Sequence, residues 1–262
     1  MRVGVDGHEV YCYTGTRPVD PVRPTVVFVH GAANDHSVFA LQSRYLAHHG
    51  RNVLAVDLPG HGRSGGPPLD GVEKIADWIA RLLDAAGVRD AGLVGHSLGA
   101  LAVLEAASRF PSRVSRIALL GPAFPMTVSD ALLAAARADD HVAFELIAGW
   151  SHSVGKQLGG NPVPGMWMMG GALRLMERCR PGALYLDLRA CHAYANGLAA
   201  AAAVRCPALL VLGGRDLMAP PTAAQGLIAA LAERQVVTLP ECGHAMMSEQ
   251  PDAVLDALAA FL

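Results

Sequence analysis

The sequence has little charge of either sign and no long uninterrupted apolar run. Lysine and arginine number 21, and aspartate and glutamate number 23, so the formal net charge at pH 7 is −2. A chain without excess positive charge cannot neutralise a series of phosphates or an anionic bilayer surface, which argues against nucleic-acid binding. The longest apolar neighbourhood, residues 91–107, is interrupted by His96, Ser97 and Glu105. It is shorter than the roughly 20 apolar residues that a membrane span needs.

Cysteine is scarce, and its five positions are scattered with no CxxC pair. Neither a disulfide framework nor a zinc site is indicated, and no HExxH or comparable spacing suggests another metal. The N-terminus carries Asp6, His8 and Glu9 where a signal peptide would be apolar. We therefore expect a protein of a reducing compartment, the cytoplasm, without bound metal and without a membrane span.

What the sequence does have is apolar material for a core. Hydrophobic residues make up 52% of the 262 positions and charged residues only 17%, which excludes a disordered chain. The length fits one large α/β domain, two smaller domains, or one domain that carries an insertion.

Short β-rich runs alternate with helical patterns along most of the chain. Such alternation indicates parallel strands joined by helical crossovers, and hence an α/β protein. The expected strands are residues 25–30, 52–56, 91–94, 114–120, 208–212 and 235–239, and the expected helices are residues 39–49, 72–86, 98–109 and 251–262.

The alternation stops after residue 121 and returns at residue 208. Between them the pattern predicts helices over residues 129–138, 142–147 and 171–178, and a loop rich in glycine and proline over residues 155–165. We therefore expect a core domain formed by residues 1–121 and 208–262, and a helical cap, or lid, inserted as residues 122–207.

A serine stands between one predicted strand and the helix that follows it, in the sequence Gly95-His96-Ser97-Leu98-Gly99. A strand-turn-helix of this kind is a nucleophile elbow, whose tight turn requires small residues two positions before and after the serine. Ser97 would stand at a helix N-terminus, where the Leu98 amide can donate to an oxyanion. The alternative is that Ser97 only caps the helix.

A serine hydroxyl needs a histidine to accept its proton and a carboxylate to orient that histidine. Asp216 follows the strand at 208–212, and His244 follows the strand at 235–239, so both are expected at the same sheet edge. A turn-only role for Asp216 is the other interpretation. The second oxyanion donor is expected in the small-residue loop after the first strand, at Ala32.

These motifs together resemble the α/β-hydrolase fold superfamily over nearly the whole chain. They are His30-Gly31, the serine elbow, the segment from Asp57 to Ser64 (DLPGHGRS), and Gly213-Gly214-Arg215-Asp216 followed by Gly243-His244. The resemblance implies an eight-stranded, mostly parallel sheet, an inserted cap, and Ser97, Asp216 and His244 as nucleophile, acid and base. Because serine rather than aspartate occupies the elbow, alkyl-enzyme chemistry is disfavoured.

Soft apolar side chains in the predicted cap are candidates for a substrate pocket. They either line that pocket or only pack the cap against the sheet. The polar cap residues His152, Lys156, Arg174 and Arg178 either anchor a polar end of the substrate or, in the favoured interpretation, are solvated. The candidate substrate-binding residues are Asn34, Trp150, Trp167, Met168 and Met246.

The expected activity is hydrolysis of small to medium carboxylic esters through an acyl-enzyme, with no cofactor and a small-molecule substrate. The rate should rise between about pH 6 and 8, because the base must be neutral. Alternatives with the same triad are carbon–carbon bond hydrolysis of a ring-cleavage dienoate, which Asn34 would permit, and lactone or thioester hydrolysis. Resemblance to the dienoate hydrolases would call for a tryptophan after His244, whereas this chain has Ala245-Met246-Met247 there, which argues against the dienoate. A ligand receptor is the alternative from another class.

A second glycine-rich match, residues 60–65 (GHGRSG), has the GxGxxG form of a dinucleotide-binding loop. Gly66-Pro67-Pro68 follows where a helix would have to begin, so we expect no dinucleotide site there.

Overall fold

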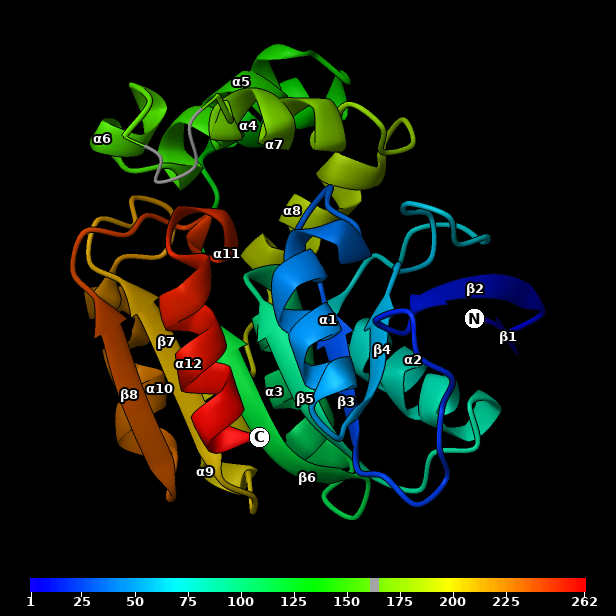
Figure 1. Ribbon diagram of the computed structural model, residues 1–262. Helices are drawn as coiled ribbons and strands as arrows, with labels where there is room; N and C mark the ends of the chain where they lie inside the picture. Colours follow the sequence, from blue (N-terminus) through cyan, green and yellow to red (C-terminus); the bar gives the residue numbers. More distant parts are fainter. Residues whose placement is uncertain (161–164) are drawn as a thin grey trace.

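A computed structural model describes residues 1–160 and 165–262 and contains an eight-stranded sheet (Figure 1). The strand order is β1-β2-β4-β3-β5-β6-β7-β8; β1 and β2 are antiparallel to their neighbours, and the other strands are parallel. The mostly parallel sheet implied by the resemblance is thus confirmed. The strands are β1 (Arg2–Val5), β2 (His8–Tyr13), β3 (Thr25–Val29), β4 (Asn52–Val56), β5 (Ala91–His96), β6 (Val114–Leu120), β7 (Ala208–Gly213) and β8 (Arg234–Leu239).

The six predicted strands all form, each within two residues of the predicted bounds. Every residue of β3, β4, β5 and β7 is buried, because helices cover both faces of a parallel sheet. The hairpin of β1 and β2 was not predicted. Its turn is Asp6-Gly7, with φ of 52° and 76°, and an Asp-Gly pair of this kind is a hairpin signal.

Two layers of helices sandwich the sheet. One layer holds α1 (Ala40–His48) and α12 (Pro251–Phe261), which lie on the viewer's side of Figure 1. The other layer holds α2 (Val72–Ala85), α3 (Leu98–Arg109), α9 (Gly197–Ala203) and α10 (Gln225–Ala230). Helix α2 buries the stripe of Ile75, Ile79, Leu82 and Leu83, whose helical spacing indicated this helix. Helix α3 is buried on nearly all sides, because α2 and α9 flank it against the strands.

Among the described residues, six helices lie between β6 and β7 in the sequence, and α4, α5, α6 and α7 of these lie at the top of Figure 1. Three of them, α4, α5 and α7, were predicted; α6, α8 and α9 were not. The last of the six, α9, packs on α3 and α10, so it belongs to the core layer although it lies within residues 122–207. The other five are α4 (Asp130–Arg137), α5 (Val142–Ser151), α6 (Val154–Gln157), α7 (Met168–Met176) and α8 (Ala183–Ala193).

The inserted helices have an apolar cluster of their own, formed chiefly by Leu132, Ile147, Met176, Leu184 and Leu188. Two further clusters fill the spaces on the two faces of the sheet. The loop predicted at residues 155–165 begins inside α6, and its residues 161–164 lie outside the described residues. No helix in the described ranges is both long and apolar enough to cross a bilayer.

Candidate active site

The turn between β5 and α3 has the geometry of a nucleophile elbow. Ser97 alone separates the two elements. Its backbone lies at φ 55° and ψ −118°, a region that residues other than glycine rarely adopt. A Cβ added to Gly95 would lie 2.1 Å from the Gly99 carbonyl oxygen, and one added to Gly99 would lie 2.2 Å from that of Val29. Only glycine fits at both positions, as the motif predicted.

Asp216 and His244 meet across the loops that follow β7 and β8. Asp216 Oδ2 lies 2.6 Å from His244 Nδ1, and Oδ1 accepts hydrogen bonds from the amides of Met218 and Ala219 at 2.8 and 2.7 Å. Burial opposes a charge on Asp216, but the His244 ring and these donors outweigh it, so the pKa of Asp216 is lowered. The carboxylate is therefore ionised and fixes the ring with Nδ1 protonated.

The other ring nitrogen of His244 faces away from Asp216. Nε2 is buried and has no hydrogen-bond partner among the described residues, so the Ser97 hydroxyl does not bond to it here. Ser97 and His244 nevertheless line the same cavity. Hydrogen bonds of this kind are often loose in the absence of substrate and tighten when it binds.

The two expected oxyanion donors flank Ser97. Ala32, in the loop after β3, lines the cavity beside Ser97, and Leu98 is the first residue of α3. Within the part of the chain that the structure describes, neither amide donates to a protein acceptor. Both are therefore free to donate to a bound oxyanion.

Two other histidines beside the site are buried and neutral. Burial lowers the pKa of His96 to about 3 and that of His30 to about 4. His96 Nε2 lies 3.0 Å from the His244 carbonyl oxygen, and His30 Nδ1 lies 2.8 Å from the Gly31 carbonyl oxygen. A carbonyl only accepts, so these two nitrogens carry the protons. Both rings contact backbone next to catalytic candidates.

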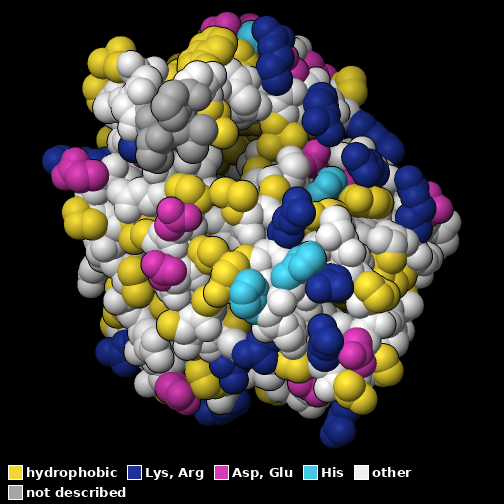
Figure 2. All heavy atoms as spheres, in the orientation of Figure 1, with side chains coloured by type: hydrophobic (Ala, Val, Ile, Leu, Met, Phe, Trp, Pro, Cys, Tyr) yellow, Lys and Arg dark blue, Asp and Glu magenta, His cyan; other side chains and the backbone are white. Residues whose placement is uncertain are grey.

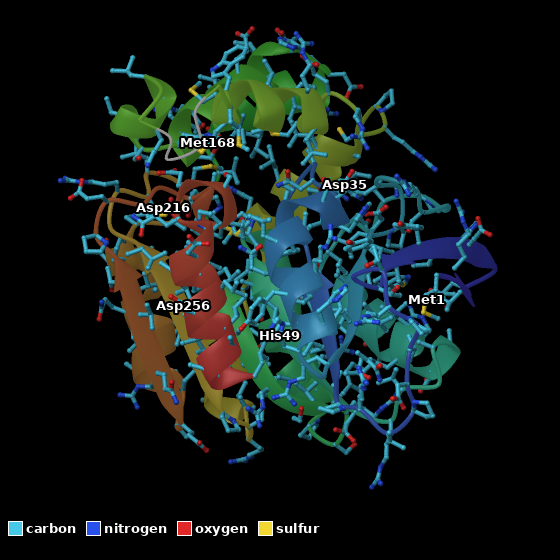
Figure 3. The ribbon with its side chains drawn as sticks, in the orientation of Figure 1. Met1, Asp35, His49, Met168, Asp216 and Asp256 are labelled. Carbon is cyan, nitrogen blue, oxygen red and sulfur yellow. The ribbon has the colours of Figure 1, made fainter. Side chains whose placement is uncertain are left out.

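A cavity of about 690 Å³ lies between the inserted helices and the carboxyl edge of the sheet. Figure 2 shows it as a hollow edged by apolar side chains, and in Figure 3 Met168, which lines the cavity, lies above Asp216. Of the candidate substrate-binding residues, Asn34, Trp150, Trp167 and Met168 line the cavity. Met246 does not; it is fully buried in the cluster on the α12 face of the sheet.

Several residues near the site were missed or misread from the sequence. His152 is buried, not solvated, and its Nδ1 lies 2.9 Å from the Ala148 carbonyl oxygen. The expectation of solvation holds for Arg178, whose side chain is 64% exposed, although it also pairs with Asp35. Buried Asp187 on α8 and Glu249 beside the His244 loop were not considered at all. The available signal for Asp187 was a carboxylate between two leucines of α8.

The segment from Asp57 to Ser64 forms a turn that is held by Asp57. Asp57 accepts from the His36 amide, from His36 Nδ1 and from the Arg63 amide, at 2.8, 2.7 and 2.8 Å. The glycine-rich residues 60–65 precede no helix until α2 begins at Val72, so they do not lead directly into a helix as a dinucleotide-binding loop does. Asp35, His36 and Asp57 lie within ligand distance of one another, but protein donors already use both carboxylates.

Fold and elbow together define a hydrolase of the α/β class. Residues 26–257 match the model of the alpha/beta hydrolase family, and the chain belongs to that family. It is 31% identical over 243 residues to a pimeloyl-[acyl-carrier protein] methyl ester esterase of Aromatoleum aromaticum, which covers 88% of this chain and 94% of that protein.

Two other comparisons agree with this assignment. An esterase of the same description from Chromobacterium violaceum is 32% identical over 257 residues, which is 91% of this chain and 94% of that protein. The enol-lactonase from Burkholderia xenovorans LB400 superimposes with a TM-score of 0.87 at 23% identity, over 100% of this chain and 99% of that one. At that identity the structural likeness shows the fold alone.

Proposed function

We propose that the protein is a serine hydrolase that cleaves neutral, apolar carboxylic esters through an acyl-enzyme. The observation that carries the proposal is the Asp216–His244 pair beside a strained serine elbow on one cavity wall. The identity to esterases over most of the chain supports it. Two of those relatives are named for a methyl ester, which supports a small alcohol as leaving group.

In this mechanism Ser97 Oγ attacks the ester carbonyl carbon while His244 Nε2 accepts the hydroxyl proton. The carbonyl oxygen becomes an oxyanion held by the Ala32 and Leu98 amides. The intermediate then collapses, the bond to the alcohol breaks, and His244 returns the proton to that alcohol. Water repeats the sequence on the acyl-enzyme and releases the carboxylic acid.

The cavity favours an uncharged acyl group. No lysine, arginine, aspartate or glutamate contributes to its lining in the described residues, and most of the side chains there are apolar. Burying an unpaired carboxylate in such a site would be costly. This argues against a ring-cleavage dienoate, which carries a carboxylate, and no observation favours that alternative.

We also propose that helices α4–α8 act as the cap predicted within residues 122–207. They have their own apolar cluster, and Ile147, Trp150 and Met168 form part of the cavity wall that faces Ser97. Acyl length would then be selected by cap side chains.

The test uses p-nitrophenyl esters of graded acyl length together with a fluorophosphonate probe. We expect turnover and covalent labelling, both lost in Ser97→Ala by at least about 1,000-fold. Ser248→Ala is the matched control, because Ser248 also lines the cavity but bonds only to the Ala245 carbonyl oxygen. Unchanged turnover in Ser97→Ala would exclude the proposed nucleophile, and a folded wild-type protein without turnover or labelling would favour a receptor.

The proposed preference for an uncharged acyl group is tested with methyl hexanoate and with the monomethyl ester of adipic acid. The two differ by a terminal carboxylate. We expect kcat/KM for the anionic ester to be lower by about 100-fold, and equal values would contradict the proposal.

A further inference from the structure

The loop that carries the Ala32 amide is held in an unusual conformation. Ala33, the next residue, has φ of 53° and is buried, and its side chain packs into the apolar cluster of the inserted helices. A non-glycine residue keeps a positive φ only where its surroundings hold it there.

Asp187 on α8 holds this loop from the inserted segment. Its Oδ2 accepts a hydrogen bond from the Ala33 amide at 2.9 Å and faces His61 Nε2 at 2.9 Å. Asp187 is only 1% exposed, so its charge is removed from water and depends on these partners.

The geometry also fixes the protonation of His61. Nδ1 lies 3.0 Å from the Pro59 carbonyl oxygen, and Nε2 faces the Asp187 carboxylate. Both partners are acceptors, so only the doubly protonated ring satisfies both contacts. Burial opposes this charge, but Asp187 outweighs burial and the pKa of His61 is raised. The other titratable groups that face the ring are neutral His30 and ionised Asp57.

We propose that Asp187 is a positioning residue for the oxyanion hole: it fixes the Ala33 peptide, and hence the direction of the Ala32 N–H, while the His61 cation balances its charge. The inference rests on the proposed function. The coupling is local, because the peptide that Asp187 holds and the peptide that bears the Ala32 amide share the Ala32 Cα. The cap would then complete the catalytic machinery of the core as well as forming the pocket.

A merely structural role is the competing explanation, since Asp187 also joins the insertion to the core. The two roles differ in what they do to transition-state binding. A displaced oxyanion donor weakens a ligand that forms a tetrahedral adduct on Ser97, and leaves a ground-state analogue of the same shape unaffected. General loosening of the cap would weaken both ligands alike.

The experiment therefore compares an alkyl trifluoromethyl ketone with the matching methyl ketone as inhibitors of wild type and of Asp187→Asn. In the variant we expect kcat to fall by about 10- to 100-fold with KM within about threefold. The trifluoromethyl ketone should lose affinity by a similar factor, while the methyl ketone keeps its affinity within about twofold.

Glu105→Gln is the matched control. Glu105 is a buried carboxylate that accepts hydrogen bonds from Tyr194 and Asn196 at 2.7 and 2.9 Å, away from the Ala32 loop. The Glu105→Gln substitution should lower the melting temperature but leave kcat within about twofold of the wild-type value. Unchanged kcat in folded Asp187→Asn, or equal losses for both ketones, would overturn the proposal.

A second variant covers the case in which Asp187→Asn does not fold. His61→Gln keeps a donor to Asp187 but removes the cation, and we expect the same selective loss of the trifluoromethyl ketone, by about 3- to 10-fold. Equal affinities of wild type and His61→Gln for this ketone would overturn the proposal. Failure of the proposed function is seen separately, because wild type itself would then not be labelled at Ser97.

Discussion

His96 and His244 are joined by a hydrogen bond from His96 Nε2 to the His244 carbonyl oxygen, 3.0 Å long, and their ring centroids lie 4.7 Å apart. The bond ties the residue before the proposed nucleophile to the backbone of the proposed base. Burial and the neighbouring His244 ring keep His96 neutral, because both oppose a second proton on its ring.

The neutral state of His96 and His30 predicts sensitivity to acid. Their folded pKa values, about 3 and about 4, lie below the ordinary 6.5, so below pH 6.5 the unfolded chain binds protons that the native protein does not. Between pH 6 and 4.5 the folding equilibrium constant should fall about tenfold per pH unit for each histidine. His61, whose pKa is raised, is protonated in the native protein over this range. The pKa values of Asp57 and Asp216 are lowered from the ordinary 3.8, so these two carboxyl groups reduce the stability chiefly as the pH falls through that value.

Urea unfolding at several pH values measures this dependence. His96→Asn should reduce the slope of the unfolding free energy against pH by the equivalent of one proton, even if it lowers the stability overall. A stability that does not change from pH 6 to 4.5 would contradict the neutral assignment of both rings.

The sequence alone predicted the parallel part of the sheet almost to the residue. Strands such as Asn52–Val56 and Val114–Leu120 are apolar runs ended by polar or turn residues, and burial on both faces leaves few alternatives for them. The elbow was predictable because its requirement is local. The close approach of Gly95 to Gly99 leaves no room for a side chain at either position, and both glycines lie within five consecutive residues of the sequence.

The contacts between the inserted helices and the core could not be predicted in the same way. Asp187 meets the Ala33 amide 154 positions away, and this pairing depends on how α8 docks, which no spacing in the sequence encodes. Glu249 is similar, since it accepts from the Ser153 hydroxyl and from the Gly243 amide, at 2.6 and 3.1 Å. Met246 illustrates the reverse error: its nearness to His244 in sequence suggested the pocket, but helix α11 (Met246–Glu249) turns it into the core.

Replacement of Asp216 by asparagine should lower kcat by about 10,000-fold, with KM little changed. The substituted side-chain amide would present a donor or an uncharged acceptor to His244 Nδ1, so the ring would lose both its fixed tautomer and the charge that stabilises the imidazolium. Single-turnover hydrolysis of a p-nitrophenyl ester measures the effect. A loss smaller than about tenfold would mean that another carboxylate orients His244.

Replacement of Gly121 by alanine should displace the imidazole. Gly121 has φ of 58°, and a Cβ there would lie 3.0 Å from both Cε1 and Nδ1 of His244. Gly87, with φ of 67° and no atom within 4 Å of an added Cβ, is the matched control for backbone strain. Both variants should lose about 1 to 2 kcal/mol of stability, but only Gly121→Ala should lose kcat, by about 10- to 100-fold. Equal activities would show that the ring tolerates the contact.

The cavity wall should set the accepted acyl length. Ala172, on α7, lines the cavity and is half-buried, so Ala172→Phe would fill part of the space facing Ser97. Octanoyl and decanoyl p-nitrophenyl esters should lose at least about tenfold in kcat/KM, because each methylene that cannot be accommodated costs a factor of this order. The acetyl ester, which needs only the space next to Ser97, should be cleaved at the wild-type rate.

Leu173→Phe adds bulk one residue further along α7 without lining the cavity, and it should leave the chain-length profile unchanged. A parallel loss across all chain lengths in Ala172→Phe would mean that α7 supports the site without selecting the acyl group.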